Sequence, residues 1–117
     1  MDNQDAQLKQ VVQPVGDVAA ATQFYRAAFG FAAKFTDGDR FAALDAGAVT
    51  LALAGPAEDI TDGVAAPAVK VADVAAALRQ VAAAGGTVVR EPQQGPHEVR
   101  AVVQDPWGNL VVVYAPA

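Results

Sequence analysis

The segment Val15–Ala21 reads VGDVAAA, and Val71–Ala77 reads VADVAAA, so one string occurs twice with a single internal change. In each copy, Asp follows an apolar run and precedes apolar residues at helical spacing. Asp is a favourable N-cap, because its carboxylate accepts hydrogen bonds from the free N–H groups of the first helical turn. Asp17 and Asp73 lie 56 positions apart in a chain of 117 residues. Repetition at this spacing predicts a fold of two similar modules.

The first module is predicted to run strand, helix and three strands over about residues 6–55. The helix begins after Asp17 and ends near Phe29, with Gly30 as its stop signal. Its aromatic residues Phe24, Tyr25 and Phe29 fall at helical spacing and are expected to pack on the sheet. The strands of this module are expected at residues 8–15, 31–36, 40–44 and 48–53.

The second module repeats this order over about residues 66–116, after a Gly- and Pro-rich linker at residues 56–65. Its helix is expected at Val74–Ala84, with Val74, Ala77, Leu78 and Val81 facing inward. Asp105–Asn109 reads DPWGN, which has the preferences of a type I turn and is interpreted as a hairpin turn without a catalytic role. The strands are expected at residues 68–71, 87–90, 98–104 and 110–114, with a loop at 91–96.

The composition excludes several classes of partner and of chemistry. Hydrophobic residues make up 53% of the chain and charged residues 18%, which suits a packed core. A net charge of −5 argues against nucleic acid and anionic membranes as partners. The absence of cysteine excludes disulfides and thiol chemistry. The polar start MDNQDAQLKQ does not resemble a signal peptide, and no apolar run is long enough to span a bilayer, so a cytoplasmic protein is expected.

The ordered set of motifs resembles one superfamily. Two tandem modules, a Val-x-Asp before each helix, FYRAAFGF at Phe24–Phe31 and DPWGN before the last strand are similar to the vicinal oxygen chelate superfamily. That superfamily contains glyoxalase I, bleomycin-resistance proteins, extradiol dioxygenases and fosfomycin-resistance enzymes. The resemblance implies an α+β fold: a single domain, residues 1–117, whose two βαβββ modules form curled mixed sheets with helices on the convex side. It also implies a homodimer.

The resemblance also implies four metal-ligand positions. Counting from the two capping Asp residues and from the strand motifs places them at Gln10, Ala52, Ala66 and Val112. Glyoxalase I enzymes can use Gln at the first position, but Ala and Val offer no donor atom to a metal. The sequence therefore predicts a member without metal, without cofactor and without the metal-dependent mechanisms of the superfamily.

Because side chains alternate between the two faces of a strand, the residues on the same face as these four positions are expected to line an apolar ligand pocket. His97, the single histidine, and Trp107 are placed at its rim, and Arg100 is expected to point outward. The chain has no Ser or Cys nucleophile to pair with His97. The predicted lining comprises Leu8, Gln10, Val12, Thr50, Ala52, Ala66, Ala68, Leu110, Val112 and Tyr114.

The leading hypothesis is a metal-free protein that binds a small hydrophobic or aromatic compound, in the manner of bleomycin-resistance proteins. No catalytic residue is assigned. The alternative is an enzyme of the same scaffold: a glyoxalase-like lyase or dioxygenase relative with an unrecognised site, or a metal-free catalyst using His97 or Tyr114. A third hypothesis is a regulatory module that uses its pocket for dimer contacts.

Overall fold

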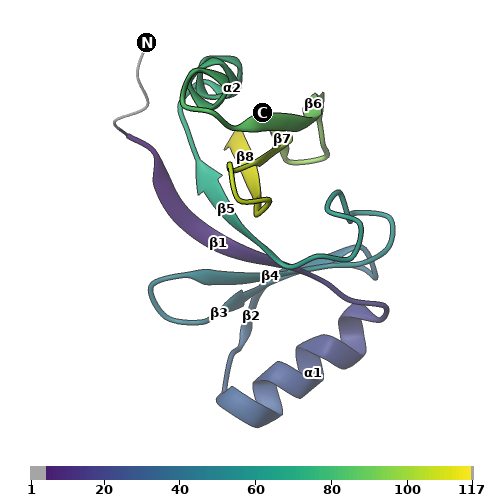
Figure 1. Cartoon of the computed structure of the whole chain (residues 1–117). Coiled ribbons are helices and arrows are strands. Elements are labelled where there is room, and N and C mark those ends of the chain that lie inside the picture. Colours follow the sequence, from purple (N-terminus) through teal and green to yellow (C-terminus); the bar gives the residue numbers. More distant parts are fainter. Residues whose placement is uncertain (1–4, 117) are drawn as a thin grey trace. The chain divides into compact units, whose positions relative to one another are not determined.

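The computed structural model describes residues 5–116, in which one order of elements occurs twice (Figure 1). This confirms the predicted α+β class and the two βαβββ modules. The predictions made from residues 1–4 at the chain start lie outside the described residues. The first module contains β1 (Gln7–Pro14), α1 (Val18–Phe29), β2 (Ala33–Asp37), β3 (Phe41–Asp45) and β4 (Thr50–Ala54). The second contains β5 (Ala66–Lys70), α2 (Val74–Ala83), β6 (Thr87–Gln94), β7 (Glu98–Gln104) and β8 (Leu110–Pro116).

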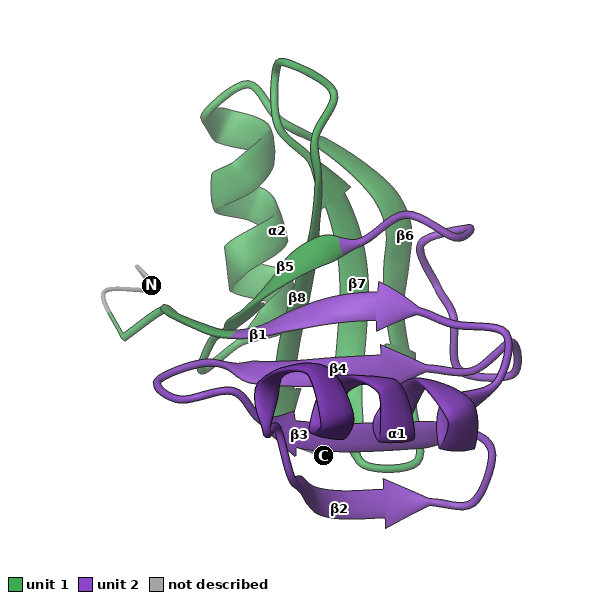
Figure 2. Cartoon of the chain, turned by 90° about the horizontal axis from the view of Figure 1, so that it is seen from below, with its two compact units in different colours: residues 1–9, 66–117 green, residues 10–65 purple. Residues whose placement is uncertain are grey.

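The chain divides into two compact units, coloured separately in Figure 2. Unit 2 is residues 10–65 and corresponds to the first module. Unit 1 contains the second module, residues 66–116, together with residues 5–9 of the described chain start. Each unit has one helix on its own mixed sheet.

The repeated Asp residues cap the two helices with the same geometry. Asp17 has φ −141° and ψ 104°, and Asp73 has φ −142° and ψ 107°. The N–H of Ala20 donates to Asp17 Oδ1 at 3.0 Å, and the N–H of Ala76 donates to Asp73 Oδ1 at 3.0 Å. The N-cap role predicted for both residues is therefore confirmed.

In unit 2 the strand order is β2-β3-β4-β1, with β1 parallel to β4 and the other neighbours antiparallel. Helix α1 lies over β3 and β4 (Figure 2). Val18, at the start of α1, packs with Ala42, Leu44 and Leu53 of the sheet, and all four are buried. The side-chain amide of Gln13 donates to the hydroxyl of Tyr25, which ties β1 to the middle of α1.

The predicted burial of the α1 aromatic residues is wrong for two of them. Phe24 is 59% exposed and Phe29 is 64% exposed, and only Val18 of this helix is buried. The rings contact one another instead, with Tyr25 5.1 Å from Phe24 and 6.2 Å from Phe29 between centroids. Helical spacing correctly groups these rings, but α1 contacts the sheet through Val18, Ala21 and Tyr25, and Phe24 and Phe29 lie outside that contact.

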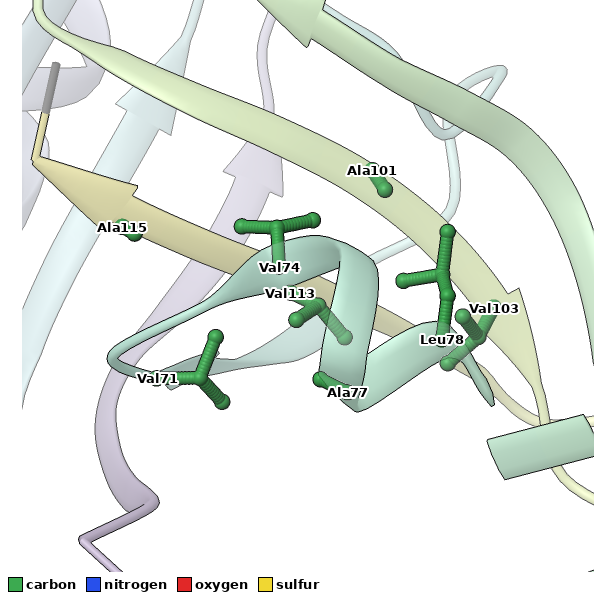
Figure 3. Close-up of a cluster of buried hydrophobic side chains, with 8 residues drawn as sticks. All are labelled: Val71, Val74, Ala77, Leu78, Ala101, Val103, Val113 and Ala115. Atoms are coloured by element: carbon green, nitrogen blue, oxygen red, sulfur yellow. The ribbon is translucent and has the colours of Figure 1, made fainter. Parts of the chain in front are cut away.

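In unit 1 the strand order is β5-β8-β7-β6, with β5 parallel to β8 and the remaining pairs antiparallel. Helix α2 places Val74, Ala77 and Leu78 on the sheet, as predicted (Figure 3). Val81 packs against the same cluster. The buried sheet residues beneath the helix are Val71, Ala101, Val103, Val113 and Ala115.

Strand β6 is longer than predicted, because residues 91–94 continue the strand and do not form a loop. The pairing with β7 shifts register twice, between Val88 and Arg90 and again between Arg90 and Gln93. Pro92 falls in the second irregular stretch of this outermost strand, where a missing N–H costs no ladder hydrogen bond. Pro and Gln residues suggested a loop in the sequence, but bulges accommodate them within the strand.

Residues 56–65, predicted as a linker, form a hydrogen-bonded loop of unit 2. Glu58 is 5% exposed and accepts a hydrogen bond from Arg40 Nε at 2.5 Å. The carboxylate of Asp59 accepts from the N–H groups of Thr61 and Gly63, both at 2.8 Å. Neither α1 nor α2 is long and apolar enough to cross a membrane, and residues 5–116 contain no other helix.

Candidate functional site

The sheet of unit 1 has two faces of different character. Val99, Ala101 and Val103 of β7 pack toward α2. Because side chains alternate along a strand, Arg100 and Val102 lie on the other face. We call this the helix-distal face of unit 1.

The strand register brings a row of polar side chains together on this face. Arg100 of β7 is opposite Tyr114 of β8, and Lys70 of β5 is the partner of Tyr114 on its other side. Directly opposed residues of neighbouring strands lie about 5 Å apart at Cβ and interact. The outward orientation expected for Arg100 is therefore wrong, since Arg100 shares a face with Tyr114.

An apolar centre adjoins this polar row. Val102 and Ala68 are both partners of Val112 across the sheet. All three are buried, as is Ala66 two residues before Ala68. Leu110 lies on β8, two residues before Val112, and is half-buried. The helix-distal face thus has small apolar residues in one part, and in the adjoining part the phenol of Tyr114 lies between Arg100 and Lys70.

The electrostatic environment favours the neutral form of the phenol. Burial raises the pKa of Tyr114, and the negative charge of Glu98 raises it further. The Tyr114 hydroxyl is therefore protonated at neutral pH and can donate a hydrogen bond. The guanidinium of Arg100 lies beside Gly95, where an added Cβ would be 3.3 Å from Arg100 Nε.

The other predicted pocket residues fall in unit 2, on β1 and β4. Gln10 is the partner of Thr50, and Val12 is the partner of Ala52, in a parallel register. Each pair therefore shares a face. Gln10, Val12 and Thr50 are half-buried, and Ala52 is fully buried. The predicted lining is thus divided between the two units, and a single pocket containing all of it stays a prediction.

The two rim residues are exposed. His97 lies between β6 and β7 and is solvent-exposed. Trp107 lies between β7 and β8 and is 83% exposed. Neither residue is part of the Lys70, Tyr114 and Arg100 row.

The DPWGN segment is a hairpin turn, as predicted. Asp105 Oδ1 accepts from the N–H groups of Trp107 and Asn109, both at 2.9 Å, and Gly108 has φ +91°. The side-chain amide of Asn109 donates to Asp105 Oδ2 at 2.9 Å. These hydrogen bonds, that of the Asn109 side chain foremost, lower the pKa of Asp105. The motif is explained by turn formation.

The residues at the four metal positions that the sequence resemblance predicts do not fit a metal. Ala52, Ala66 and Val112 have no donor atom, and the carboxamide of Gln10 supplies one oxygen. Within residues 5–116, no group of three or more His, Cys, Asp or Glu side chains is arranged to hold a metal ion.

Comparison with protein families gives one clear assignment. The model of the Glyoxalase/Bleomycin resistance protein/Dioxygenase superfamily matches residues 7–113. The chain belongs to this superfamily. It is 44% identical over 112 residues to an uncharacterized protein of Mycolicibacterium smegmatis, and the alignment covers 96% of both chains.

Solved structures of the same fold include proteins with different names. One is the NAD-dependent benzaldehyde dehydrogenase of Legionella pneumophila, with a TM-score of 0.78, 18% identity and coverage of 92% of this chain and 98% of that chain. Another is a variant of the methylmalonyl-CoA epimerase of Streptomyces coelicolor in complex with 2-nitronate-propionyl-CoA. It has a TM-score of 0.73, 24% identity and coverage of 95% and 94%. At these identities the likeness shows the fold alone.

Lys70 was not predicted as a pocket residue, and Arg100 was predicted on the face of β7 opposite to that of Tyr114. A usable signal was present, because Ala66, Ala68 and Lys70 alternate along one strand. The pairing of β5 with β8 was needed to place Lys70 beside Tyr114.

Proposed function

We propose that this superfamily member binds a small aromatic or hydrophobic compound without a metal ion. The observation that carries the proposal is the donor set at the family's metal positions. Three of the four side chains, Ala52, Ala66 and Val112, cannot bind a metal, although the scaffold around them is retained. A protein of this kind sequesters its ligand, and an antibiotic is one class of ligand to test.

The helix-distal face of unit 1 supports a ligand with one apolar and one anionic end. Small buried residues such as Ala68 and Val112 offer a surface for a flat ring. Tyr114 can donate a hydrogen bond from its protonated hydroxyl. Arg100 and Lys70, on either side of it in the register, favour a carboxylate or phenolate. An aromatic carboxylate is the simplest compound that uses all of these groups.

Thermal unfolding of the purified chain with a panel of ligands tests the proposal. The panel contains aromatic carboxylates such as 1-naphthoate, neutral aromatic compounds and antibiotics that contain aromatic rings. A ligand present at 100 times its Kd adds about 2.7 kcal/mol to the free energy of unfolding. For a chain of this length, that raises Tm by about 10 °C. If no aromatic compound in the panel raises Tm, the proposal fails.

Substitutions then test the assigned residues. Arg100→Gln removes the cation beside Tyr114 and is expected to weaken binding of 1-naphthoate about tenfold, since charge-assisted hydrogen bonds contribute about 1.5 to 3 kcal/mol. Arg79→Gln on α2 is the matched control, because it removes an exposed cation from the opposite side of the sheet. Equal effects of the two substitutions would show that the ligand responds only to net charge.

An enzyme is the second candidate, supported by the shared fold with methylmalonyl-CoA epimerase. In a metal-free enzyme, Tyr114 or His97 would have to move the proton. Metal analysis of the purified protein discriminates between a metal-dependent enzyme and the metal-free binding protein. A stoichiometric divalent metal favours the enzyme and contradicts the binding protein.

A homodimer also remains a proposal, and so does a purely regulatory role for dimer contacts. Sedimentation of the chain with and without 1-naphthoate distinguishes these cases. A ligand-binding protein retains its affinity for 1-naphthoate whatever its oligomeric state, whereas a regulatory module that uses its pocket for dimer contacts has no site for the compound.

A further inference from the structure

A pocket of about 440 Å³ lies on the α2 side of the unit 1 sheet. Its volume is within the usual range for small-molecule sites. All of its lining residues belong to unit 1. The sheet separates it from Tyr114, so it is distinct from the helix-distal face.

The floor of the pocket is apolar. Val71, Val103 and Val113 form it, together with Ala77 of α2. These four side chains are labelled in Figure 3, where α2 crosses the sheet. All four are short, so they leave space that Leu or Phe side chains would fill.

The end of α2 defines one wall. Val81 and Ala84 line the pocket at the last turn of the helix. Gly86 then passes so close to the helix that an added Cβ would lie 2.6 Å from Val81 Cγ1. This tight turn fixes the wall, while Ala84 remains exposed at the rim.

The polar side chains of the pocket are neutral or negatively charged. Gln80, Gln104 and Asp105 contribute the polar side chains, and Asp105 is the one charged residue of the lining among residues 5–116. The described part of the chain contributes no Lys, Arg or His to the lining. The Asp105 carboxylate accepts hydrogen bonds from Trp107 and Asn109 within the turn, and these interactions hold it in its charged form. Its negative charge attracts a cationic group that enters the pocket.

We propose that unit 1 contains a second binding site, beside α2, for a small apolar compound that carries an amine. The apolar part lies on the Val71, Val103 and Val113 floor, and the ammonium group approaches Asp105. This preference is opposite to that proposed for the helix-distal face, where Arg100 and Lys70 favour an anion. The proposal is independent of the function proposed above.

Two indole compounds of similar size provide the test. Tryptamine carries an ammonium group, and indole-3-acetate carries a carboxylate on the same ring. We expect tryptamine to shift the methyl NMR signals of Val69, Val81 and Val111, which line the pocket and are half-buried. Tryptamine is expected to bind at this site about tenfold more tightly than indole-3-acetate, because the carboxylate is repelled by Asp105.

Ala84→Phe places a ring in the pocket at an exposed position, so the fold is expected to persist. Ala83→Phe is the matched control, since Ala83 is exposed on the same helix and does not line the pocket. We expect Ala84→Phe to weaken tryptamine binding about tenfold or more and Ala83→Phe to leave it unchanged. The Tm of each variant without ligand confirms that it is folded.

Three results would overturn the proposal. The first is the absence of methyl shifts with tryptamine at millimolar concentration. The second is equal binding to the Ala84→Phe and Ala83→Phe variants. The third is equal affinity for tryptamine and indole-3-acetate at these methyl groups, which would contradict the assigned role of Asp105.

Discussion

The two capping Asp residues allow one prediction to be tested twice in the same molecule. Asp17→Ala and Asp73→Ala each remove a 3.0 Å hydrogen bond at a helix N-terminus. Neither helix has an acidic residue in its first turn that could replace the lost charge. We therefore expect each substitution to lower the free energy of unfolding by about 1 to 2 kcal/mol, and Tm by about 4 to 8 °C.

Urea denaturation followed by circular dichroism measures both losses. Because the two caps have nearly the same backbone angles, the two losses are expected to agree within about 0.5 kcal/mol if unfolding is two-state. Asp17→Asn and Asp73→Asn are the controls, since Asn keeps the capping hydrogen bond and is nearly as favourable at this position. If the Ala and Asn variants are equally unstable, the capping hydrogen bond does not have the role assigned to it.

Three further predictions concern single side chains. The pKa of Tyr114 is raised above 10 in the folded state, so the protonated phenol stabilises the fold below pH 10, and this stabilisation is lost as the pH rises through the folded-state pKa. Glu98→Gln removes a negative charge beside the phenol, and ultraviolet titration of this variant should show a lower pKa for Tyr114. Glu58→Gln weakens the hydrogen bond from Arg40 and is expected to cost about 1 to 2 kcal/mol in urea denaturation, with a loss near zero indicating that the pair is fully screened. Gly86→Ala is expected to cost about 1 to 3 kcal/mol in the same assay, because its Cβ meets a side-chain carbon at 2.6 Å, and an unchanged stability would show that the turn relaxes freely.

Local chemistry made much of the fold predictable from the sequence. The repeated Val-x-Asp gave both helix starts, since capping depends on one residue and its immediate neighbours. The inward face of α2 also followed from spacing, because small residues such as Ala77 suit close packing on a sheet. The turn at Asp105 was predictable because its hydrogen bonds all lie within five residues.

The predictions that were wrong concern side chains whose orientation or burial depends on residues distant in the sequence. Strand alternation places Arg100 and Val102 on one face of β7 and Ala101 on the other. Both faces carry buried apolar residues, Val102 on one and Ala101 on the other, so the sequence of the strand does not show which face packs on α2. The exposure of Phe24 on α1 depends on which side of the helix faces the sheet, and that side is the one with Val18, Ala21 and Tyr25. The pocket beside α2 depends on the space left by side chains from five segments, which no local pattern encodes.

Ligand-induced thermal stabilisation, measured with and without a chelator of divalent metals, tests the central claim most directly. The claim is that this superfamily member binds an aromatic ligand although Ala52, Ala66 and Val112 stand where the sequence resemblance predicts metal ligands. We predict that 1-naphthoate or a related aromatic carboxylate raises Tm by the same amount in both conditions. Stabilisation that disappears with the chelator and returns on addition of a divalent metal would contradict the account.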